Sequence, residues 1–292
     1  MIRHWLQLIF DISLIAFMLG NLSAMGLQLR LADAWTPLRS IRFVGRTLFA
    51  GFFVSPALAY VVARIVPMEA PFATGLLLLG LAPSAPFLPL VVKKANGDLA
   101  AAAGTMLLAS VGTIVIMPVA VPLAAPGLSA DAWRIAKPLF CLVLIPLASG
   151  IFIKSMWPAR AVVLHCYVKH ITGVSTIIFL AMVIVLNFKT IAGSVGSHAL
   201  IAQFLYVPAT AITGYLCSAG MPGAKRSVVS LGTCTRNIGI AAAIVGTDGD
   251  QRTMVMLVFA TLVTLIVSFG TAAWFSRAGH QPLVHDPTVH RI

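Results

Sequence analysis

Nine apolar stretches separated by short polar connections account for most of the chain. Several reach about twenty residues, the length at which an α-helix spans a hydrocarbon core of about 30 Å. The pattern predicts an all-α membrane protein with nine transmembrane helices in a single polytopic domain over residues 1–292. The expected segments cover residues 5–29, 43–66, 72–92, 99–124, 133–157, 161–188, 197–219, 227–246 and 253–275.

Composition and charge support this prediction. Hydrophobic residues make up 59% of the chain and charged residues only 10%, against about 25% charged residues in soluble domains. The net charge of +12 comes largely from basic residues in alternate connections, as the positive-inside rule describes. We therefore expect a bacterial inner-membrane protein with its N-terminus outside, its C-terminus in the cytoplasm, and residues 280–292 as a cytoplasmic tail.

The segment at residues 227–246 has a polar centre that a simple membrane helix does not tolerate. Thr233, Thr235, Arg236, Asn237 and Gly239 fall within it, and a charge at the centre of a bilayer helix costs about 2.5–3.5 kcal/mol. One interpretation is a kinked helix in which the arginine pairs with a neighbour. We favour a broken helix whose backbone and polar side chains line a binding cavity.

A second broken helix is predicted at residues 72–92. Pro83, Pro86 and Pro89 lie close together there, and each proline removes a backbone donor and clashes with the preceding turn. Because proline is tolerated in the first turn of a helix, a second half-helix is expected to begin near Pro86. Ser84 then lies in the break, where freed carbonyl groups need protein or water as partners.

Two further segments resemble each other and indicate an internal repeat. The stretch FFVSPALA around Pro56 is similar to the stretch FLYVPATA around Pro208. These two segments are five segments apart, as are the two broken ones, and an odd offset inverts one copy in the membrane. Secondary transporters with inverted repeats bind substrate near the midplane. We therefore expect repeats at about residues 5–124 and 133–275, with the broken helices crossing at the midplane.

Five motifs in order along nearly the whole chain resemble those of the bile acid:sodium symporter family. They are MGLQL at residues 25–29, GLLLLGLAP at 75–83, KKANG at 93–97, LIPLASG at 144–150 and RNIGIA at 236–241. Members of this family have ten helices, or nine when the first is absent. The resemblance implies the nine-helix form, which fits an external N-terminus.

The positions at which this family binds sodium are altered. By an ungapped comparison, the family's glutamate falls on Gly232 and its glutamine on Arg236. The family's serine–asparagine pair falls on Leu88 and Pro89, and an earlier glutamine falls on Gly51. A sodium ion needs several oxygen ligands, and these side chains supply none. We therefore expect deficient sodium sites, and no metal or cofactor.

Arg236 offers a substitute for the missing cation. Its guanidinium group is permanently charged and has five donors. It is expected either to occupy the place of the cation or to bind a substrate carboxylate through two parallel hydrogen bonds. The predicted substrate-binding residues are Arg236, Asn237, Thr235, Thr233, Ser84, Pro86 and Gly239.

Asp11, Lys169 and His170 also lie inside apolar segments. Asp11 is interpreted as a structural partner of Arg236, Lys169 or His170, or as a proton-coupling group. Lys169 and His170 are expected near a helix end, where a long side chain reaches the membrane surface. His170 is a second coupling candidate because histidine titrates near neutral pH.

These features predict a secondary active transporter of small or amphipathic organic anions that works without sodium, as a uniporter or coupled to protons. The alternative is a membrane sensor that binds an organic anion without transporting it. No paired carboxylates, nucleophile–base set or metal-ligand cluster indicates an enzyme. The expected partners are an organic anion and the lipid bilayer, and no stretch has the mixed basic and aromatic residues of a nucleic-acid surface.

Overall fold

The computed structural model describes residues 2–29, 31–124, 137, 140–194, 197–246 and 249–278. Within these ranges the regular structure is helical, apart from one isolated β bridge. The elements are α1 (Ile2–Gln28), α2 (Leu31–Leu38), α3 (Ile41–Phe49), η1 (Ala50–Val54), α4 (Ser55–Ile65), α5 (Ala70–Leu81), α6 (Leu88–Lys94), α7 (Leu99–Ala124), η2 (Phe140–Leu144), α9 (Ile145–Met156), α10 (Pro158–Gly193), α11 (Ala199–Cys217), α12 (Gly223–Cys234), α13 (Ile238–Val245) and α14 (Gln251–Arg277).

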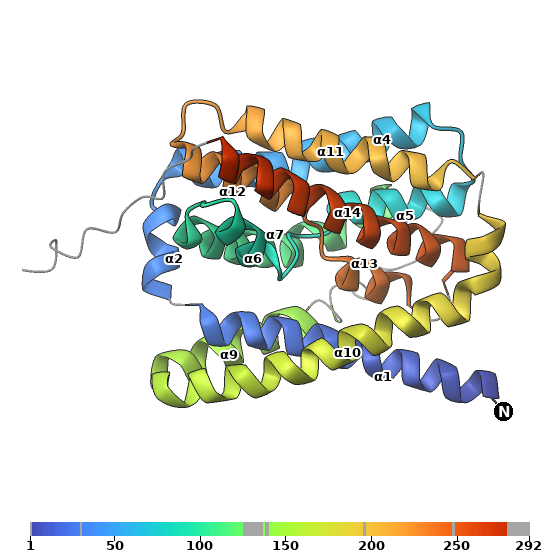
Figure 1. Ribbon diagram of the computed structural model, residues 1–292, viewed down its shortest axis with the longest axis horizontal. Helices are drawn as coiled ribbons and strands as arrows, with labels where there is room; N and C mark the ends of the chain where they lie inside the picture. The colour runs from blue at the N-terminus through green and yellow to red at the C-terminus, as the bar shows by residue number, and fades with distance from the viewer. Residues whose placement is uncertain are drawn as a thin grey trace, which may run out of the picture.

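The helices fall into two groups. α1, α9 and α10 lie together along one side of the molecule (Figure 1), and α1 packs against both of the others. α4, α5, α11, α12 and α14 lie in the other group, where α5 packs on α4 and α14 and α11 packs on α12. α13 packs on α5 and α14 in the second group and also contacts α1. These contacts, together with those of α10 with α14, join the two groups.

Close backbone packing holds α1 against α9. A Cβ atom added at Gly26 would lie 2.4 Å from the carbonyl oxygen of Leu147, and one added at Gly150 would lie 2.6 Å from that of Ser23. Glycine at both positions lets the two helix backbones meet, as small residues do in membrane helix pairs. The first group is therefore fixed by backbone contact as well as by apolar side chains.

The all-α prediction is confirmed, and each of the nine expected segments contains helix where the chain is described. Within the described residues, six helices are long and apolar enough to cross a membrane, and the two broken segments and the described part of the fifth segment consist of shorter helices. The count of nine crossings therefore stays a prediction. The six candidate spans are Trp5–Gln28, Ile41–Ile65, Leu99–Leu123, Pro158–Leu186, Ala199–Cys217 and Gln251–Arg277.

The sequence pattern missed two features. The basic connection after the first segment contains a short helix, α2, which packs against α7. The sixth segment extends from Pro158 to Gly193, beyond both of its predicted ends. At 1.5 Å per residue a helix of 36 residues is about 54 Å long, which exceeds the hydrocarbon core. The start of the fifth segment and the tail at residues 280–292 lie outside the described residues.

Candidate functional site at the crossing of two broken helices

Both predicted breaks are present, and the two broken segments cross each other. α5 ends at Leu81 and α12 ends at Cys234, and the residues that follow them, Ala82 and Thr235, are extended. The extended stretches pair in antiparallel fashion through the Ser84–Arg236 bridge. The Ala85 amide donates to the Thr235 carbonyl at 3.0 Å, and the Asn237 amide donates to the Pro83 carbonyl at 2.8 Å. The crossing thus satisfies backbone groups that neither broken helix satisfies alone.

Arg236 is enclosed at this crossing. Its relative exposure is 2%, and it is among the largest fully buried side chains. Nη1 donates to the carbonyl oxygens of Ala82 at 2.9 Å and Gly51 at 3.3 Å. Nε and Nη2 are also buried and have no hydrogen-bond partner among the described residues. One nitrogen of the guanidinium is thus held by two backbone oxygens, while donors remain on the other two nitrogens.

Two prolines explain why these carbonyl oxygens are free. In the π-helical turn η1 the Ser55 amide donates to the Ala50 carbonyl, five residues earlier. The next bond in that register would run from residue 56 to Gly51, but Pro56 has no N–H. Likewise, a continuing helix would pair the Ala82 carbonyl with residue 86, which is Pro86. Each proline therefore leaves an acceptor that the guanidinium uses.

A second set of contacts around Arg236 was not predicted. The Ser55 hydroxyl donates to the Gly80 carbonyl at 3.1 Å and is 2.6 Å from the Tyr206 hydroxyl. Because Ser55 has one hydroxyl proton, Tyr206 must donate to Ser55, and this leaves the lone pairs of Tyr206 free. The Tyr206 hydroxyl also interacts electrostatically with the guanidinium. The only sequence signal was the position of Ser55 and Tyr206 beside Pro56 and Pro208.

The other polar residues predicted for the site mostly hold the crossing together. The Ser84 hydroxyl donates to the Gly232 carbonyl at 2.7 Å and so ties one broken segment to the other. The Asn237 side chain accepts from the Ile240 amide at 3.3 Å and caps α13. The hydroxyls of Thr233 and Thr235 donate back to carbonyls of α12, those of Val229 and Leu231.

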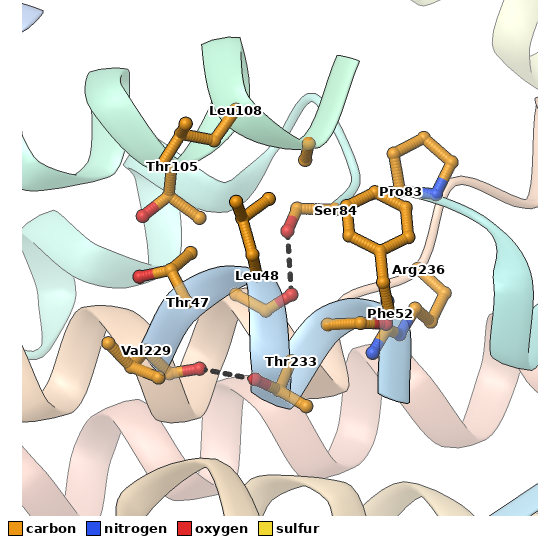
Figure 2. A pocket seen from close by; sticks show the side chains of 13 residues that line it. Thr47, Leu48, Phe52, Pro83, Ser84, Thr105, Leu108, Val229, Thr233 and Arg236 are labelled. Carbon is orange, nitrogen blue, oxygen red and sulfur yellow. Dashed lines mark hydrogen bonds between the residues drawn. The ribbon is translucent and has the colours of Figure 1, made fainter. Parts of the chain in front are cut away.

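A small cavity adjoins the crossing (Figure 2). Its volume is about 10 Å³, room for about one water molecule. The hydroxyls of Thr47 and Thr105 are buried beside it without a hydrogen-bond partner in the described chain, and sequence reasoning missed both. An organic anion does not fit this cavity unless the surrounding helices move. The lining residues are Thr47, Leu48, Gly51, Phe52, Pro83, Ser84, Thr105, Leu108, Ala109, Val229, Gly232, Thr233 and Arg236.

Three of the positions aligned with the family's sodium ligands meet at this cavity, and two do not. Gly51, Gly232 and Arg236 all line it. A Cβ atom added at Gly232 would point toward the Thr105 methyl group, at 3.0 Å, and the Ser84 hydroxyl, at 3.5 Å. Leu88 and Pro89 instead begin α6, where Leu88 is buried in the apolar core. Ser84 supplies the first broken segment's hydroxyl at the cavity, which Leu88 and Pro89 do not line.

Several predicted residues lie away from the cavity. Pro86 is half-buried in the break and does not line it. Gly239 lies against α1, since an added Cβ would be 2.5 Å from the Phe17 ring, and its glycine is explained by packing. Lys169 and His170 are exposed and lie three turns into α10, so the expected position near a helix end is wrong.

The expected ion pair of Asp11 does not form in the described part of the chain. Asp11 is half-buried in α1, and the ion pairs there join Arg252 to Glu69 and to Asp250. Residues 227–246 are divided into α12 and α13, and Arg236 forms no ion pair in the described part of the chain. The interpretation of this segment as one kinked helix with a paired arginine is therefore wrong. Backbone oxygens, not a carboxylate, hold Arg236.

Comparison with known proteins agrees with the motifs. The model of the "Sodium Bile acid symporter family" matches residues 14–198. Over 156 residues the chain is 28% identical to a protein of Oryza sativa subsp. japonica named "Probable sodium/metabolite cotransporter BASS2, chloroplastic". The similarity covers 53% of this chain and 36% of that relative, so the chain spans little more than a third of the relative's length. With apolar helices long enough to span a bilayer and a family match over more than half its length, the chain is an integral membrane protein that belongs to the sodium bile acid symporter family.

Proposed function

We propose that this protein is a secondary active transporter of small or amphipathic organic anions that works without sodium. The observation that carries the proposal is the buried Arg236 guanidinium, bound to two backbone carbonyl oxygens where two broken helices cross. Carbonyl oxygens are ligands for cations, and here a cation that belongs to the protein takes them. A permanent positive charge without a carboxylate partner favours an anion as the transported species.

Sodium independence follows from the ligands at the cavity. Gly51 and Gly232 contribute no side-chain oxygen, and the Gly51 carbonyl is already an acceptor for Arg236. The remaining side-chain oxygens that line the cavity are four single hydroxyls: those of Ser84 and Thr233 donate to backbone carbonyls, and those of Thr47 and Thr105 have no partner in the described chain. A sodium ion would have to displace a covalently attached guanidinium from this position. We infer that the tethered cation replaces the exchangeable one.

An inverted repeat accounts for the placement of the crossing. Pro56 and Pro208 are 152 residues apart, and so are the bridge partners Ser84 and Arg236. The first residues of α7 and α14, Leu99 and Gln251, have the same spacing. The same spacing between two prolines, two bridge partners and two helix starts supports a duplicated unit, with the Ser84–Arg236 bridge on the symmetry axis of the repeat. In such carriers the axis lies near the bilayer midplane, where substrate binds.

Topology tests the repeat independently. With nine crossings the N-terminus is outside and the C-terminus is in the cytoplasm, as the distribution of basic residues favours. Reporter fusions after Ala32, after Met156 and at the C-terminus should read cytoplasmic, and fusions after Met68 and Gly249 should read external. An external C-terminus would contradict both the count and the inversion.

Counterflow in sodium-free proteoliposomes tests transport. Labelled pyruvate, pantoate and taurocholate represent keto acids, hydroxy acids and bile-acid-like steroids, and we expect counterflow of at least one of them. Added sodium should not stimulate it, and a proton gradient alone tests the coupling roles of Asp11 and His170. Saturable binding with no counterflow would favour a sensor instead, and stimulation by sodium would contradict the tethered cation.

A further inference from the structure

We propose that the carrier works as an electroneutral exchanger of monovalent anions, and that its net flux in a cell with a negative interior is outward. The inference rests on the proposed function, because it concerns how an anion carrier with a built-in cation moves charge. Transport activity alone determines neither the coupling nor the direction of net flux.

The charge of the site can be counted residue by residue. Of the 13 residues that line the cavity, Arg236 is the one with a charged side chain (Figure 2). The described ion pairs all involve Arg252, and the described residues contain no cluster of acidic, histidine or cysteine side chains able to hold a metal ion. The ionisable side chains that interact with the guanidinium are Tyr206 and Cys234, which are neutral near pH 7. The empty site therefore has a charge of about +1, and a monovalent anion makes it neutral.

The net charge of the carrier differs between the two halves of a transport cycle, because the carrier is loaded in one and empty in the other. The loaded carrier is neutral at the site, so its reorientation from one side of the membrane to the other moves no net charge through the membrane field. The empty carrier must return with the buried charge of Arg236 uncompensated, which opposes its passage through a low-dielectric region. A sodium-coupled carrier releases its cation before this step, but Arg236 is part of the chain and stays. Return with a second anion is therefore faster than return empty, and the result is exchange of one anion for another.

The membrane potential acts on the step that moves charge. Each net cycle transfers one negative charge, because the loaded step is neutral and the empty step moves one positive charge the opposite way. With a negative interior, inward net transport is opposed and outward net transport is favoured, by about tenfold in the equilibrium gradient for each 59 mV. Exchange transfers no net charge, so the potential does not drive it. Because no exchangeable cation accompanies the anion, net accumulation from outside is unfavourable.

Proteoliposomes loaded with or without unlabelled anion separate these two modes. With labelled pyruvate, pantoate or taurocholate as the probe, uptake into loaded vesicles should exceed uptake into empty vesicles at least tenfold. A potential set by potassium and valinomycin should leave the exchange rate unchanged. Made negative inside, the same potential should accelerate net efflux and retard net uptake.

Three outcomes bear on the proposal. Equal uptake into loaded and empty vesicles would overturn exchange while leaving the carrier function standing, and so would net uptake that accelerates with a negative interior. No counterflow of any of the three probes would instead overturn the carrier function itself. Arg277→Gln, at an exposed position in the last turn of α14, removes the same charge away from the site and should keep the exchange pattern.

Discussion

Residues 82–87 and residues 235–237 both interrupt a membrane helix, and they pair with each other, yet they contribute different groups to the crossing. The first break is rich in proline and offers carbonyl oxygens, those of Ala82 and Pro83. The second supplies donors for these oxygens, the Arg236 guanidinium and the Asn237 amide, and its Thr235 carbonyl accepts from the Ala85 amide in return. Hydrogen bonds in both directions between the two segments explain why two breaks that would be unstable in hydrocarbon are stable together.

The two breaks also have different roles. Prolines make the first one stiff and remove the backbone donors at positions 83 and 86, so its shape is set by the backbone. The second depends on one long charged side chain, whose burial is offset by the carbonyl oxygens of the first half of the chain. The first break is therefore a fixed receptor for the cation that the second break supplies. Substitutions in the two breaks should have unequal effects.

The largest effect is expected from Arg236→Gln. Hydrogen bonds to charged groups contribute about 1.5–3 kcal/mol each, and the substitution also removes the site's positive charge. Anion counterflow should fall at least tenfold and should not become sodium-dependent, since Gly51 and Gly232 still lack side-chain ligands. Arg236→Lys should also lose most activity, because an ammonium group lacks the planar fork. Full counterflow by Arg236→Gln, measured beside Arg277→Gln, would reduce Arg236 to a structural residue.

Equivalent glycines in the last turns of α5 and α12, just before the two breaks, should respond differently to alanine. Gly80 and Gly232 are 152 residues apart. An added Cβ at Gly80 would lie 2.8 Å from Ala59 Cβ and 3.2 Å from Pro56 Cα, where the backbone must move. The contact at Gly232 is with Cγ2 of the Thr105 side chain, at 3.0 Å, which can give way without a movement of the backbone.

We expect Gly80→Ala to lower the free energy of unfolding by about 1–3 kcal/mol, and Gly232→Ala to lower it by less. Gly270→Ala in α14, with nothing within 4 Å of an added Cβ, controls for helix propensity. Thermal unfolding in detergent measures all three, and an equal loss at Gly80 and Gly232 would contradict the view that the first break is the stiffer one.

A smaller effect is expected for Tyr206→Phe. The change removes the hydrogen bond from Tyr206 to Ser55, worth about 0.5–1.5 kcal/mol, but keeps the ring and the Ser55–Gly80 bond. Counterflow should fall less than in Arg236→Gln, because the carbonyl contacts of Arg236 persist. Tyr167→Phe, at an exposed position on α10, is the matched control. Equal activity of both variants would show that the hydroxyl of Tyr206 does not help to position the guanidinium.

The smallest effect is expected at the exposed ion pair of Asp250 and Arg252, in contrast to the buried Arg236. Hydrogen bonds from Arg252 hold the pKa of the Asp250 carboxyl below its usual value of 3.8. A lowered pKa means that Asp250 contributes stability above the unfolded pKa and that this contribution is lost as the pH falls through the folded pKa. Thermal stability should therefore decline slightly below about pH 4. Asp250→Asn should remove that part of the decline, and an identical pH profile would contradict the assignment.

The sequence located both breaks because proline and a buried charge are local signals. Pro83, Pro86 and Arg236 each disfavour a continuous membrane helix wherever the rest of the chain lies. The partners of Arg236 were not predictable in the same way, because the acceptors are backbone atoms whose freedom depends on a π-helical turn. Nor did the sequence show that Ser55 and Tyr206 meet, since they are on different helices and 151 residues apart. The proposed pairing of Asp11 failed for the same reason, because opposite charge alone does not define a contact.

The oxygens that bind Arg236 belong to the main chain, and this has an evolutionary consequence. Substitution cannot remove a backbone carbonyl, so the acceptors persist in descendants that have lost every side-chain ligand around them. Gly51 has open space around an added Cβ and should accept alanine. Pro56 and Pro86 decide whether the carbonyls of Gly51 and Ala82 are available, and purifying selection should act on them instead. A deep mutational scan should find low tolerance at these two prolines and higher tolerance at Gly51.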